Sequence, residues 1–201
     1  MQNTKLILDD LINKSSEELK DRLLNILSTK SYKEGKFILA SGKESTFYLD
    51  GKLSSLDAEG GALISLLFLR LLKPEVSDVG GITMGADPLA SGVSQIGFLL
   101  GKNINAFYIR KESKGHGTNK FVEGPLVAGS NVAILEDVVT TGGSSLKAIE
   151  RVTEYGCKVI QVLAIVDRNQ GGKEAFANLG IDYQCLFDIS QIQERYKKLK
   201  N

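Results

Sequence analysis

The chain has 201 residues, a length that suits one α/β domain with a single core, or one domain with a small appendage. Hydrophobic residues make up 42% of it and charged residues 24%, which is ordinary for a globular protein and excludes a disordered chain. The formal net charge of +1 excludes a global field that attracts nucleic acid or an anionic membrane, so any anion must be bound by a local cluster.

Three features indicate a cytoplasmic protein without a structural zinc site. The longest apolar stretch, residues 63–72, is interrupted by Ser65 and Arg70 and is too short to span a membrane. Two aspartates interrupt the short apolar stretch near the N-terminus, which argues against a signal peptide. Cys157 and Cys185 stand apart in apolar surroundings and are expected to be reduced, and a single histidine leaves too few ligands for zinc.

The first third of the chain predicts a helix followed by a hairpin. Ser15 and Glu18 have the spacing of a capping box, and leucines recur behind them at helical intervals, which predicts a helix with one buried face. Residues 36–39 and 45–50 then flank the polar segment 40–43, an arrangement typical of a β-hairpin.

From residue 57 onward, helices and strands are predicted to alternate. Asp57 can cap a helix that runs to Leu72, and Asp87 can cap a second helix that begins with Pro88 and runs to about Leu100. The strands are expected at 79–82, 105–109, 132–135, 159–166 and 183–187, the other helices at 144–155, 173–179 and the C-terminus, and a glycine-rich loop at 110–124. This alternation predicts an α/β fold with a parallel sheet and right-handed crossovers, whose ligands bind beyond the carboxyl ends of the strands.

The segment 132–145, Val-Ala-Ile-Leu-Glu-Asp-Val-Val-Thr-Thr-Gly-Gly-Ser-Ser, is the most informative in the chain. An apolar strand delivers Glu136 and Asp137 to the sheet edge, where carboxylates can accept hydrogen bonds from ribose hydroxyls and favour positive charge at the anomeric carbon. The glycines, amides and helix N-terminus that follow favour a phosphate group. A solvated acid pair in an ordinary strand–turn–helix is the alternative, and neither a Walker loop nor a GxGxxG fingerprint is present. The complete order therefore predicts a sugar-phosphate site.

Residues 110–120, Arg-Lys-Glu-Ser-Lys-Gly-His-Gly-Thr-Asn-Lys, form a basic loop in a nearly neutral chain. Glycines flank the single histidine, which is typical of a lid, although a solvated charged loop is the alternative. Lys111, Lys114 and His116 are suited to neutralise a diphosphate leaving group and to exclude water from the reacting carbon. We interpret His116 as a hydrogen-bond donor to a phosphate. The alternatives are that it is an imidazolium near the anionic leaving group, or simply a surface residue.

Together these motifs resemble the orotate phosphoribosyltransferases, a family of type I phosphoribosyltransferases. The matching parts are the phosphoribosyl pyrophosphate (PRPP) motif at 132–145, the catalytic loop at 110–117, the substrate hood at 37–43 with Ser45 and Tyr48, and the orotate-binding segment at 166–172. They cover roughly residues 30 to 175, in the order that the family shows.

The resemblance implies a single domain, residues 1–201, with a type I phosphoribosyltransferase core at about 56–201 and a small N-terminal hood at about 1–55. It implies transfer of the 5-phosphoribosyl group from PRPP to orotate, giving orotidine 5′-phosphate and pyrophosphate in UMP biosynthesis. Mg²⁺ is implied to arrive mainly on PRPP, without a dedicated protein cage. The implied assembly is a homodimer that shares its catalytic loop across the interface, with neither nucleic acid nor membrane as a partner.

The resemblance also assigns roles to individual residues. The implied catalytic residues are Lys111, Lys114, His116 and Asp137. The implied PRPP-binding residues are Arg110, Lys111, Lys114, His116, Glu136, Asp137, Val138, Val139, Thr140, Thr141, Gly142, Gly143 and Ser144, with the loop 81–86 approaching the pyrophosphate. The implied orotate-binding residues are Lys43, Tyr48, Thr140 and Arg168, whose planar fork suits an anionic ring.

Two departures and two alternatives accompany the resemblance. Some members have lysine where this chain has Ala40, and Lys43 is the candidate to supply that charge; some have a lysine in the pyrophosphate loop, where residues 86–88 are Ala-Asp-Pro. The first alternative is a phosphoribosyltransferase for another base. The second is a PRPP-sensing transcription regulator that has lost catalysis, although about 30 residues before the hood are few for a DNA-reading module.

Overall fold

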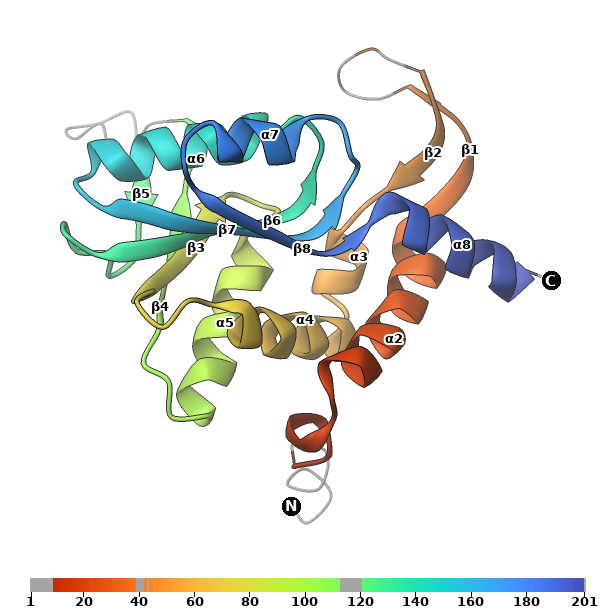
Figure 1. The fold of residues 1–201 in the computed structure, drawn as a ribbon, viewed down its shortest axis with the longest axis horizontal. Helices are drawn as coiled ribbons and strands as arrows, with labels where there is room; N and C mark the ends of the chain where they lie inside the picture. The colour runs from red at the N-terminus through yellow and green to blue at the C-terminus, as the bar shows by residue number, and fades with distance from the viewer. Residues whose placement is uncertain (1–8, 39–41, 43, 113–120, 201) are drawn as a thin grey trace.

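The computed structural model describes residues 9–38, 42, 44–112 and 121–200, and in this part of the chain a six-stranded sheet is covered by helices, with a two-stranded hairpin beside it (Figure 1). The sheet order is β5-β4-β3-β6-β7-β8. Its strands are β3 (Asp78–Ile82), β4 (Asn105–Ile109), β5 (Val122–Glu123), β6 (Asn131–Val139), β7 (Lys158–Asp167) and β8 (Asp182–Asp188). All neighbours pair in parallel except β4 and β5, so the predicted α/β fold is confirmed.

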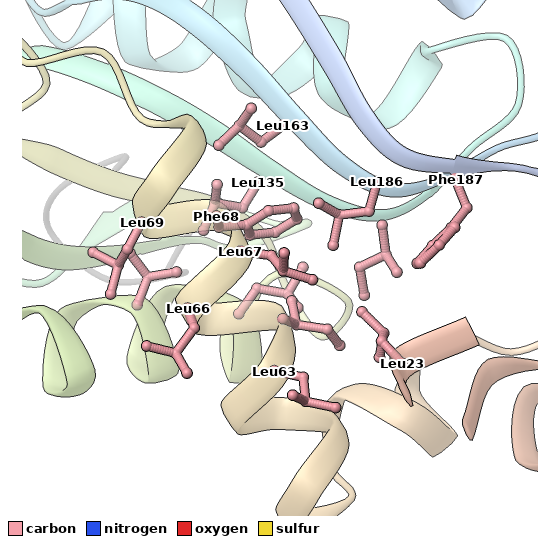
Figure 2. Packing of buried hydrophobic residues seen from close by; sticks show 14 of the residues in the cluster. Leu23, Leu63, Leu66, Leu67, Phe68, Leu69, Leu135, Leu163, Leu186 and Phe187 are labelled. Atoms are coloured by element: carbon pink, nitrogen blue, oxygen red, sulfur yellow. The ribbon is translucent and has the colours of Figure 1, made fainter. Parts of the chain in front are cut away.

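Helices cover both faces of this sheet, and β6 shows why. Ala133 and Leu135 belong to one buried cluster and Val132 and Ile134 to the other, because neighbouring residues of a strand point to opposite faces. The first face is covered by α2 (Ser16–Ile26), α4 (Ala58–Leu71), α5 (Asp87–Leu99) and α8 (Ile189–Lys200), and the second by α6 (Gly143–Glu154) and α7 (Gly172–Ala177). Figure 2 shows α4 of the first face, where Leu67 and Phe68 lie close to Leu135, Leu163 and Leu186.

The helix starts agree with the sequence at two places and differ at a third. Ser15 and Glu18 form the predicted capping box of α2, and the Asp57 carboxylate caps α4 by accepting from the amide of Gly60 at 3.0 Å. The prediction for α5 was wrong: Ala86 occupies the N-cap position, and Asp87 is the first helical residue. Pro88 still occupies the first turn, where its missing N–H costs no helical hydrogen bond.

The hairpin consists of β1 (Tyr32–Ile38) and β2 (Glu44–Leu49), which pair antiparallel as predicted. Its base is anchored to the core, because the Tyr32 ring lies 5.6 Å from the ring of Phe47 and 4.9 Å from that of Tyr196 on α8. The π-helical turn η1 (Leu27–Ser31) enters β1, and the short helix α3 (Lys52–Ser55) follows β2. The sequence predicts neither element, nor the two-residue edge strand β5.

No helix in the described part of the chain combines the length and apolar character needed to cross a membrane. Cys157 is buried, Cys185 is half-buried, and both are free thiols.

Candidate active site

The side chains of the two acidic residues of β6, Glu136 and Asp137, point to opposite faces of the sheet. Glu136 points toward α6, where its carboxyl accepts a hydrogen bond from Ser145 Oγ at 3.0 Å. Asp137 points the other way and fits between two glycines: a Cβ on Gly51 or on Gly85 would lie 2.8 Å from an atom of its side chain. The predicted pair therefore lies on opposite faces of β6 near its carboxyl end, since the strand continues to Val139, and both residues line a cavity.

The surroundings of Glu136 favour the protonated form of its carboxyl. Burial raises the pKa of its carboxyl to about 8, the negative charge of Asp137 adds to that rise, and the hydrogen bond from Ser145 opposes it. The side chain is 9% exposed, so water offers the ionised form little stabilisation. Burial and the neighbouring charge of Asp137 therefore both favour the protonated form of the Glu136 carboxyl in the free protein.

The loop after the acid pair lines the first cavity, of about 240 Å³, which is formed by Glu136 and residues 138–145. Gly142 takes a left-handed conformation, with φ of 82°, at the N-terminus of α6. No side chain caps this helix, so the amides of its first turn remain available to an anion. Gly172 lets α7 pack closely behind the loop, because a Cβ there would lie 2.3 Å from Val139 Cγ1.

A second cavity, of about 260 Å³, adjoins the first at Glu136 and Ser144. The other residues lining it are Asp137, the segment 82–85 at the end of β3, Lys52 and Lys111. Lys111 is a predicted site residue, whereas the sequence gives no indication of Lys52. The position of Lys52 depends on the packing of Gly51, the N-cap residue of α3, against Asp137, and these two residues are far apart in the chain.

Arg151 of α6 contacts both ends of the basic loop. The guanidinium of Arg151 donates to the carbonyls of Arg110 and Lys111 and lies 4.0 Å from the centroid of the Phe121 ring. The amide of Arg110 also donates to the carbonyl of Phe121, at 2.8 Å. The Arg110 side chain pairs with Glu123 at 3.3 Å and does not line either of the two cavities.

Two of the predicted orotate-binding residues, Arg168 and Tyr48, contact or belong to the hairpin. Arg168 follows β7, and its guanidinium carbon lies 4.6 Å from the centroid of the Phe47 ring. Its Nε is buried without a partner in the described structure, and burial lowers the pKa of the guanidinium. Tyr48 is 43% exposed and packs on Phe37, with a ring separation of 5.6 Å, on the face of β2 opposite to Phe47.

Asp167 holds the turn that carries Arg168. Its carboxylate accepts from the amide of Asn169 at 2.7 Å and from the hydroxyl of Tyr183 at 2.9 Å. Lys43, Lys114 and His116, three further predicted site residues, lie outside the described residues. Within the described ranges, no group of three or more His, Cys, Asp or Glu side chains is arranged to hold a metal ion.

The fold and this site define a class. Residues 78–182 match the family of phosphoribosyl transferase domains, and they include β3 to β7 and the whole loop after the acid pair. The chain therefore belongs to the phosphoribosyltransferases.

Similar proteins narrow the class. The orotate phosphoribosyltransferase of Synechocystis sp. is 45% identical over 97% of this chain and 99% of its own length, and that of Thermosynechococcus vestitus is 46% identical over 90% and 97%. The crystal structure of Mycobacterium tuberculosis orotate phosphoribosyltransferase in complex with PRPP is 31% identical, covers 87% of this chain and 99% of its own, and has a TM-score of 0.75. Within its class, the chain belongs to the orotate phosphoribosyltransferase family.

Proposed function

We propose that this chain transfers the 5-phosphoribosyl group of PRPP to N1 of orotate, forming orotidine 5′-phosphate and pyrophosphate on the route to UMP. One observation carries the proposal: two adjoining cavities meet at Glu136 and Ser144, beside Asp137. PRPP has a 5′-phosphate, a ribose and a diphosphate in that order. The protein offers a loop of amides, an acid pair and a basic cavity in the same order.

The 5′-phosphate occupies the first cavity. Thr140, Thr141, Gly142, Gly143 and Ser144 present their amides and hydroxyls there, and the N-terminus of α6 adds a favourable dipole. Val138 and Val139, the last two residues of β6, also line this cavity.

Glu136 and Asp137 bind the ribose hydroxyls in the middle of the site. As the bond from C1 to the diphosphate breaks, positive charge develops on the ribose, and the carboxylate of Asp137 stabilises it. Glu136 in its protonated form can both donate to and accept from a hydroxyl. This gives the two neighbouring acids different tasks.

The diphosphate occupies the second cavity, where Lys111 already lies. Lys114, His116 and Arg110 add positive charge from the basic loop. The proposal includes a homodimer in which this loop is shared across the subunit interface, and a cytoplasmic location for the enzyme. It treats residues 1–201 as one domain, with about 1–55 as the hood and about 56–201 as the core.

Orotate binds between the hairpin and the turn after β7. Arg168 donates to the anionic ring through the edge of its guanidinium, whose Nε has no other partner in the described structure. Lys43 and Thr140 complete the proposed base site, and Tyr48 is assigned to it as well, although its ring lies on the face of β2 opposite to Phe47 and packs on Phe37. Nucleophilic attack by the deprotonated N1 forms the new C1–N1 bond, while the electron pair of the breaking C1–O bond leaves with pyrophosphate.

The residues present also fit a Mg²⁺ ion that arrives on PRPP. Asp137 offers carboxylate oxygens at the second cavity, and oxygen ligands of this kind suit Mg²⁺. When bound, Mg²⁺ would neutralise part of the negative charge on the phosphate groups of PRPP. The protein itself orients the ribose and excludes water from C1.

A spectrophotometric assay tests the proposed function. Purified protein is mixed with Mg²⁺, PRPP and either orotate, uracil, adenine or hypoxanthine, and both base consumption and pyrophosphate release are followed. We expect orotate to be consumed with stoichiometric pyrophosphate release and the other bases to react far more slowly. Preference for a purine, or no turnover of any base, would contradict the proposal.

A further inference from the structure

We propose that Lys52, at the start of α3, is a further ligand of the diphosphate and supplies a cation that the 82–88 segment lacks. The inference rests on the proposed function and deepens it. Lys52 lines the second cavity together with Lys111, and these two are its cationic residues in the described part of the chain. The end of β3 and the turn after it contribute Ile82, Thr83, Met84 and Gly85, none of which carries a charge.

The position of Lys52 depends on a close backbone contact. Gly51 lies directly against Asp137, and any side chain there would collide, because a Cβ would come within 2.8 Å of Asp137 Cβ. Gly51 is also the N-cap residue of α3, so the contact fixes where that helix begins. Lys52, the next residue, is therefore held beside the acid pair by the fold.

Asp50 orients the Lys52 side chain. One carboxylate oxygen of Asp50 accepts from the Lys52 amide at 3.1 Å and lies 2.6 Å from Lys52 Nζ. The hydrogen bond between the Lys52 ammonium and the Asp50 carboxylate raises the pKa of Lys52 and keeps the side chain charged. An ammonium group has three donors, so pairing with Asp50 leaves donors for phosphate oxygens.

A second lysine–aspartate pair supplies a matched control. Lys73 Nζ lies 3.3 Å from Asp182, and its side chain is 41% exposed, against 38% for Lys52. Lys73 lines neither cavity of the site. An exposed ion pair contributes little to stability, so any difference between the two lysines in ligand binding reflects the position of Lys52.

The test compares Lys52→Gln, Lys52→Arg and Lys73→Gln with the wild-type enzyme. Calorimetry measures the affinity of each for pyrophosphate with Mg²⁺ and for orotidine 5′-phosphate, which has no diphosphate; steady-state kinetics give kcat and KM for PRPP. For Lys52→Gln we expect a Kd for pyrophosphate raised about 10- to 100-fold, the scale for a lost hydrogen bond to a charged group. Orotidine 5′-phosphate affinity should stay within about 2-fold, Lys52→Arg should recover part of the loss, and Lys73→Gln should match wild type.

Two results of the binding measurements would overturn the inference. If Lys52→Gln binds pyrophosphate as tightly as the wild type does, Lys52 is not a ligand of the diphosphate. If the affinities for pyrophosphate and for orotidine 5′-phosphate fall equally, Lys52 has a general structural role. Should Lys52→Gln not fold, amine acylation of the wild-type enzyme decides. Saturating Mg²⁺-pyrophosphate should protect Lys52 and leave Lys73 reactive, and unprotected Lys52 would refute the proposal. An inactive wild-type enzyme would contradict the proposed function, whereas an active one with normal Lys52→Gln binding contradicts this inference alone.

Discussion

Two neighbouring carboxyl groups on one strand differ in their surroundings because they face opposite sides of the sheet. Glu136 is buried beneath the first turn of α6 and bonded to Ser145, and its pKa is raised to about 8. Asp137 contacts Gly51 and Gly85 at the second cavity. The strand period of two therefore gives the adjacent acids separate functions in the proposed reaction.

Stability should depend on pH through Glu136. Between the ordinary carboxyl pKa, 4.5, and about 8, the folded state binds a proton that the unfolded state has lost, so the free energy of unfolding falls as pH rises. Glu136→Gln lacks this proton, and its stability relative to wild type should increase steadily from pH 5 to pH 8 and then level off. Urea unfolding at several pH values measures this, with the exposed Glu150→Gln on α6 as the control. A constant difference across the range would contradict the prediction.

Arg168 should decide the affinity for the base and leave that for the sugar phosphate unchanged. Arg168→Gln removes the charged donor beside the hairpin, so KM for orotate should rise about 10- to 100-fold, the scale for a hydrogen bond between charged groups. KM for PRPP serves as the internal control and should change by less than about 3-fold. Equal changes in both constants would indicate that the turn after β7 had been distorted.

At the scale of elements, α6 links the two loops of the site. Its N-terminus forms the end of the first cavity, and its Arg151 clamps both sides of the basic loop through two carbonyls and the Phe121 ring. A shift of α6 therefore displaces the phosphate-binding loop and the base of the loop that carries Lys111 together.

Arg151→Gln should slow turnover without removing any residue from the site. The two bonds to Arg110 and Lys111 are lost, the basic loop is less well positioned, and kcat should fall about 10- to 100-fold, as for small misplacements of catalytic groups. Arg195→Gln on α8, which loses its bonds to Asn25 and Asp21, is the control and should keep its kcat. A normal kcat in Arg151→Gln would show that the loop does not need this clamp.

The sequence predicted the elements whose signals are local. Capping of α2 by Ser15 and of α4 by Asp57 depends on residues three positions apart, and the strands of the sheet are visible as apolar runs. Edge strand β5 has two residues, too few to show a period. The N-cap of α5 is Ala86, one residue earlier than predicted, and Asp87 lies inside the helix with its Oδ1 buried and without a hydrogen-bond partner in the described structure. Lys52 and the charge state of Glu136 depend on contacts between distant segments, which no local pattern records.

At the scale of the whole molecule, the proposed sharing of the basic loop between subunits predicts complementation. Lys114→Ala and Asp137→Asn should each be nearly inactive as homodimers. If subunits exchange at random, half of the mixed population carries one intact site, and activity should return to about a quarter of the wild-type value, as expected for a two-fold symmetric assembly. Analytical ultracentrifugation should first establish the dimer. Absence of recovery after proven exchange would show that each loop serves its own subunit.

The contact of Arg168 with Phe47 joins the hairpin to the sheet at the proposed base site. A guanidinium that lies over an aromatic ring can keep donors at its edge for a ligand, so the contact with Phe47 restricts the positions that those donors can take. Mild heating that detaches the hairpin while β3 to β8 stay folded should therefore abolish pyrimidine recognition first. At such temperatures the enzyme would lose its selectivity for orotate, while the sheet would still bind PRPP.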